Sequence, residues 1–129
     1  IRDSGKTGPL LGAASSALLN ALKKLAGIDQ EIDLVSARAI EPIQTLKTNY
    51  LGSRNPRLHT DEILIALSSS AAENETAAIA LRQLSKLKGC DMHSTVILSS
   101  VDTDTLKRLG MYLTCEPAYE QEDRKYHKL

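Results

Sequence analysis

The sequence predicts an α/β domain with a small, mostly parallel sheet of about three strands packed with helices. Apolar residues recur at helical intervals in several segments, and short alternating or β-branched runs separate these segments. Because helices alternate with the strand-like runs, the strands are expected to be parallel and joined by right-handed crossovers. A sheet this small, in a chain that does not open on Met, indicates part of a larger multi-domain protein.

The first half of the chain contains two helical patterns with one strand-like run between them. Apolar residues at intervals of three and four predict a helix over 10–25, which Gly27 is expected to end. Alternation over 32–35 predicts a short strand. Residues 36–48 begin with a capping serine and predict a second helix, with Pro42 either starting or kinking it.

Two further helices are expected before the main strand. Thr60 is a good N-cap, and the two acidic residues after it suit the positive end of a helix dipole. Asn74 or its neighbour Glu73 marks the end of that helix. Apolar periodicity over 77–87 predicts the next helix, and Gly89 is expected to terminate it.

The last part of the domain reads as strand, helix and strand. Residues 95–98 form a continuous apolar run typical of a central strand. Asp102 is expected to cap a short helix that Gly110 ends, and alternation over 111–115 predicts the final strand. The segment 99–102 follows the central strand, so it either lines a crevice or simply caps the helix.

Composition limits the functions open to this chain. Sixteen basic and sixteen acidic residues balance, and there are four Tyr but no Trp or Phe, so no nucleic-acid partner is expected. There is no membrane-length apolar run and no signal-peptide pattern. Two cysteines in a domain with a good core suit reduced thiols in the cytoplasm. We expect a linker or loop at 1–9, a single domain at 10–119 and a tail at 120–129.

The stretch between the second and third predicted helices contains the candidate site. Arg54 and Arg57 flank a turn, and arginine suits phosphate or carboxylate. Backbone N–H groups at the start of the next helix would add affinity for an anion. We expect Arg54, Asn55, Arg57 and Ser53 to bind a small anionic ligand, and His59 to act as the catalytic acid or base.

Other interpretations of this stretch stay open. The arginines pair instead with Asp61, Glu62 or a neighbouring domain if the segment is an interface, which would make this a non-catalytic interaction or oligomerisation domain. His59, His93 and the two carboxylates are able to bind a metal, but no metal-binding spacing is present, so no metal site is expected. The sequence names no cofactor and does not decide whether the domain is catalytic.

Many segments, in order, resemble one family of bacterial proteins, DUF1846, also called UPF0371. The segments that carry the resemblance are Leu11–Ser16, Leu19–Lys23, Leu25–Ile28, Ile40–Ile43, Leu51–His59, Asp61–Glu62, Gly89–Cys90, His93–Leu98 and Leu113–Pro117. The resemblance covers Leu10 to Tyr119 and implies the C-terminal region of a much longer, functionally uncharacterised protein. It implies the N-terminal region of that protein as a partner, with a homo-oligomer as another possibility, and it transfers no catalytic residues.

Overall fold

The structure of the chain is a computed structural model that describes residues 5, 8, 10–95 and 97–116. The predicted tail at 120–129 lies outside the described residues. Of the predicted linker at 1–9, only Gly5 and Gly8 are described. The predicted domain limits therefore stay a prediction.

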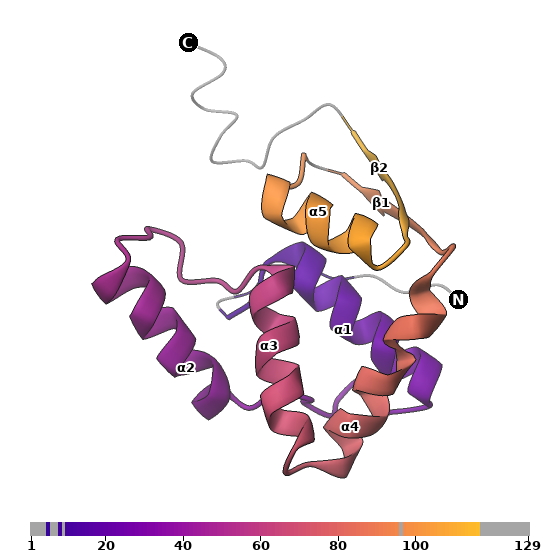
Figure 1. Ribbon diagram of the computed structural model, residues 1–129, viewed down its shortest axis with the longest axis horizontal. Helices are drawn as coiled ribbons and strands as arrows, with labels where there is room; N and C mark the ends of the chain where they lie inside the picture. Colours follow the sequence, from indigo (N-terminus) through magenta and orange to yellow (C-terminus); the bar gives the residue numbers. More distant parts are fainter. Residues whose placement is uncertain (1–4, 6–7, 9, 96, 117–129) are drawn as a thin grey trace.

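Helices dominate the described part of the chain, and two short strands come late in it (Figure 1). In order, the elements are α1 (Ala13–Ala26), α2 (Ala37–Thr45), the π-helix η1 (Leu46–Tyr50), α3 (Thr60–Ala71), α4 (Glu75–Arg82), the 3₁₀-helix η2 (Gln83–Leu87), β1 (Asp91–Ser94), α5 (Ser100–Arg108) and β2 (Tyr112–Cys115). Figure 1 shows α2 at one side of the molecule and the two strands toward the other, with α1 and α3 between them.

The strands pair in parallel, as the alternation of elements predicts. Asp91 is in register with Tyr112, and Ser94 with Cys115, while α5 makes the crossover between the strands. The predicted strand at 111–115 is confirmed as β2. The number of strands was overestimated, because the described residues form a sheet of two strands and not three.

Two predicted strands are not found among the described residues. Leu34 and Val35 are both buried, so the run at 32–35 enters the core with consecutive side chains and forms bends instead of an alternating strand. Along 95–98, the described residues are not in a strand. The strand comes just before them, and the apolar run instead connects Ser94 to Ser99, which caps α5.

The helix boundaries follow the capping chemistry of the sequence. Gly27 ends α1 with a left-handed backbone, φ 71°, and the side chains of Ser36 and Asn74 accept hydrogen bonds at the starts of α2 and α4. The predicted caps of α3 and α5 lie inside those helices, and the N-cap residues are His59 and Ser99. Capping residues thus place most helix ends to within a few residues.

The main core lies between helices. Its buried side chains include Leu22 of α1, Ile40 of α2 and Leu67 of α3, together with Leu58 from the loop that precedes α3. No strand residue belongs to this cluster of described residues. The loop before α3 is therefore anchored in the core by Leu58, and the two-stranded sheet lies outside that core.

Gly110, in the turn before β2, has a backbone conformation that any larger residue would strain. It adopts φ +86°, and a Cβ placed there would lie 2.8 Å from Lys88 Cγ. Gly89 has nearly the same φ of +85° but open space around it. We expect Gly110→Ala to lower the free energy of unfolding by about 2 kcal/mol and Gly89→Ala by about 1 kcal/mol, measured by urea unfolding. Equal losses would show that the contact with Lys88 costs nothing.

Candidate functional site

The loop that carries the predicted site begins at the end of η1 and is fixed by a buried lysine. Lys47 Nζ donates to the Arg57 carbonyl at 2.6 Å and to Glu62 Oε1 at 2.9 Å. The backbone carbonyl of Lys47 also accepts from the Ser53 N–H at 2.8 Å. One residue therefore connects both ends of the loop to the first turn of α3.

Short hydrogen bonds between neighbours shape the middle of the loop. The Asn55 N–H donates to Ser53 Oγ at 3.2 Å, and the Arg57 N–H donates to Asn55 Oδ1 at 3.0 Å. These bonds order the turn that contains the candidate ligand-binding residues. They also occupy the amide oxygen of Asn55, which leaves its NH₂ group as the donor for an incoming molecule.

The two arginines differ in their surroundings. The half-buried Arg57 donates through Nε to the Gly8 carbonyl at 2.6 Å. Arg54 is exposed, and its guanidinium has no hydrogen bond or ion pair within the described residues. Neither arginine pairs with Asp61 or Glu62, so Arg54 is the more available of the two for an outside partner.

His59 faces a buried carboxylate from a distant part of the chain. Asp102 lies in the first turn of α5, and its Oδ1 accepts hydrogen bonds from both the N–H and the hydroxyl of Thr60, each at 2.8 Å. His59 Nδ1 lies 3.5 Å from Asp102 Oδ2. The His59 side chain is 31% exposed, whereas Thr60 is fully buried. Asp102 thus anchors α3 and leaves a partly accessible imidazole beside it.

Three of the backbone N–H groups at the start of α3 are bonded to side chains. The His59 N–H donates to Glu62 Oε1 at 2.8 Å, the Thr60 N–H to Asp102, and the Glu62 N–H to Asp61 Oδ1 at 2.8 Å. The domain's own carboxylates therefore take the place that the sequence assigned to a bound anion at this helix start.

The chain matches the family described as domain of unknown function DUF1846, C-terminal, over residues 4–125. The chain belongs to the DUF1846 family. It is 59% identical over 119 residues to a UPF0371 protein of Corynebacterium glutamicum, covering 92% of this chain and 24% of that protein. Relatives from Corynebacterium aurimucosum and Streptococcus sanguinis, also UPF0371 proteins, are 57% and 50% identical over 97% of this chain and 25% of each protein. The family resemblance noted in the sequence is confirmed.

The match covers only part of each family protein. This DUF1846 chain spans about a quarter of the length of the relatives that it matches. No helix among the described residues combines the length and apolar character needed to cross a membrane.

Two observations on the DUF1846 domain bear on metal binding. Among the described residues, no three His, Cys, Asp or Glu side chains come together as metal ligands. His93 lies within β1 and not before a strand, where its Nδ1 is 2.8 Å from Thr114 Oγ1 and its Nε2 is 3.7 Å from Glu116 Oε1. The ring nitrogens of His93 therefore face a side chain of β2 and that of Glu116, the residue after it. The carboxylate near His59 is that of Asp102.

Sequence reasoning missed two residues of this arrangement. Asp102 was considered as a cap or as part of a crevice, but no local pattern shows that it contacts Thr60, 42 positions earlier. Lys47 was not singled out, because an amphipathic helix commonly has lysines on its outer face. The one available signal for Asp102 is the position of 99–102 directly after the predicted strand at 95–98.

Proposed function

We propose that this domain contributes an anion-binding loop and an oriented histidine to an enzyme site for a small phosphate- or carboxylate-bearing molecule. Arg54 and Arg57 bind the anion with Ser53 nearby, the Asn55 amide orients it, and His59 exchanges a proton with it. The observation that carries this proposal is the placement of His59 against Asp102, because a carboxylate beside one ring nitrogen orients an imidazole for acid–base work.

The state of the loop supports the anion-binding part of the proposal. The backbone of the loop is held in place by Lys47 and by hydrogen bonds between neighbouring residues. Binding through Arg54 and Asn55 therefore does not have to order the loop backbone first. The Arg54 guanidinium is free of partners within the described residues and offers a planar set of donors. Hydrogen-bond donors that are already positioned, and that have few partners within the domain, favour ligand binding over a purely structural role.

We also propose that the site is completed from outside this domain. The two cavities described for this chain are lined by α1, α2 and the adjoining segments, and neither includes Arg54 or His59. Small-molecule sites usually enclose most of their ligand. The site therefore needs further walls, and the remaining length of the family protein is the proposed source. A cytoplasmic location also stays a prediction.

A thermal-shift screen tests the proposal. Nucleotides, sugar phosphates, carboxylates and divalent metals would be added to a full-length family protein that contains this domain and to the chain alone. A ligand at one hundred times its dissociation constant stabilises by about 2.7 kcal/mol. Arg54→Ala with Arg57→Ala should abolish that shift, whereas Arg82→Ala, which changes an exposed arginine on α4, should keep it. A panel without any shift would count against the anion site.

The second candidate function is the interaction domain considered from the sequence. The observation that favours it is the exposed Arg54, since an unpaired arginine suits a carboxylate of another domain as well as it suits a ligand. Loss of assembly in the double arginine variant, without any effect of ligand, would favour this alternative. Loss of the ligand shift with assembly intact would favour the enzyme site.

A further inference from the structure

One apolar surface of the domain leads up to the start of the candidate loop. It runs along the outer side of α2 and η1, and it consists of Pro42, Leu46, Tyr50 and the adjoining Leu51, which we call the α2 face. Leu46 is 51% exposed, Tyr50 77% and Leu51 71%. Large apolar side chains exposed singly are ordinary, but a contiguous group of them marks an interaction surface.

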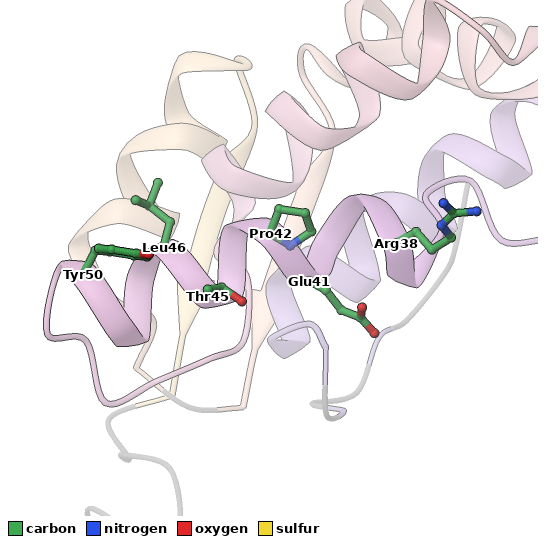
Figure 2. Close-up of a pocket in the computed structure, with 6 residues that line it drawn as sticks. All are labelled: Arg38, Glu41, Pro42, Thr45, Leu46 and Tyr50. Carbon is green, nitrogen blue, oxygen red and sulfur yellow. The ribbon is translucent and has the colours of Figure 1, made fainter.

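The spacing of these residues explains why they share a side of the helix. Pro42, Leu46 and Tyr50 follow one another at intervals of four, while Ile40 and Lys47 point to the opposite, buried side. Figure 2 shows the side chains of a shallow groove along this surface, with Arg38 and Glu41 at one end and Leu46 and Tyr50 at the other. The apolar part is therefore bordered at one end by charges of both signs.

We infer that the α2 face docks onto the N-terminal part of the same family protein. The matching relatives are about four times as long as this chain, because the chain covers 24% of their length, and the matched region is the C-terminal one. Contacts between domains of one chain are commonly of modest size and mixed polarity. Apolar side chains bordered at one end by charges of both signs fit that description. The inference does not depend on the anion site.

The small extent of the α2 face favours a tethered partner over a second copy. A stable complex of separate proteins needs about 800 Å² from each partner. Four apolar side chains with a charged border make a smaller patch than that. A partner in the same chain is held at a high effective concentration, so a small surface suffices. The partner segment is expected to present apolar side chains at its centre and charges of both signs at its edge.

Cysteine labelling of a full-length family protein with this domain tests the docking. After every native cysteine of that protein is replaced by serine, Cys90 and Cys115 included, a single cysteine is introduced as Tyr50→Cys, or as Leu46→Cys in a second variant. The matched control is Glu73→Cys, at an exposed position in the turn between α3 and α4. We expect a maleimide to label positions 50 and 46 at least roughly tenfold more slowly than position 73, and all three equally in denaturant.

Two results would overturn the inference. Equal labelling at positions 50, 46 and 73 in the native full-length protein would show that the α2 face is open to solvent. Protection that disappears when the protein is diluted by about a hundredfold would show that a second copy covers the face, since only an intermolecular contact depends on concentration. Protection that persists on dilution supports docking within the chain.

Discussion

Replacing Asp102 by alanine is expected to lower the free energy of unfolding of this domain by about 3 kcal/mol, because two buried donors lose their acceptor. The N–H and the hydroxyl of Thr60 both donate to Asp102 Oδ1, and Thr60 is fully buried. Removing the carboxylate leaves these groups without a partner and without access to water. Urea unfolding measures the loss through the midpoint at constant slope.

Two control variants separate the parts of this effect. Asp102→Asn keeps an oxygen acceptor and should cost clearly less than the alanine variant. His59→Gln removes the imidazole, which is only 3.5 Å from the carboxylate and 31% exposed, and should cost less than about 1 kcal/mol. If His59→Gln destabilises the domain as much as Asp102→Ala, the histidine and not Thr60 is the main structural partner of Asp102.

The helices could be predicted from the sequence because their signals are local. Apolar periodicity and the caps at Gly27, Ser36 and Asn74 depend on residues within a few positions of each other. The strands were harder to predict because pairing is decided elsewhere in the chain. The apolar run at 95–98 has the composition of a strand, yet Asp91–Ser94 is the segment in register with β2.

In the candidate site, too, local features could be predicted from the sequence and contacts between distant segments could not. The sequence identified the arginine loop and His59, and the structure places the loop as an ordered turn before α3. It did not identify Asp102 as the neighbour of His59, because packing of α3 against α5 creates that contact. Whether Ser53, Arg54, Asn55, Arg57 and His59 act on a ligand stays a prediction.

Replacing Lys47 by alanine is expected to lower the free energy of unfolding by about 2 kcal/mol. Its ammonium group is bonded to the Arg57 carbonyl and to Glu62, with the two side chains only 9% and 22% exposed. Breaking a buried pair by removing one partner costs about 3–5 kcal/mol. The loss expected for Lys47→Ala lies below that range because Glu62 still reaches some solvent and keeps its hydrogen bond from the His59 N–H.

The choice of substitution distinguishes the charge of Lys47 from its packing. Lys47→Met keeps most of the aliphatic chain, so it should retain that part of the stability while losing both hydrogen bonds. The matched control is Lys107→Met, which changes an exposed lysine of α5 and should alter stability by less than about 0.5 kcal/mol. Equal stability of the Lys47→Met and Lys107→Met variants would mean that the Lys47 ammonium contributes nothing to the fold.

The position of Lys47 gives this variant a consequence beyond stability. The lysine joins η1, the arginine loop and the first turn of α3, so its loss frees the loop at the Arg57 carbonyl and releases one partner of Glu62. Glu62 in turn accepts from the His59 backbone. If the loop binds an anion, Lys47→Met should weaken that binding although Lys47 has no assigned contact with the ligand. A variant that is destabilised yet binds with full affinity would place the ligand away from this loop.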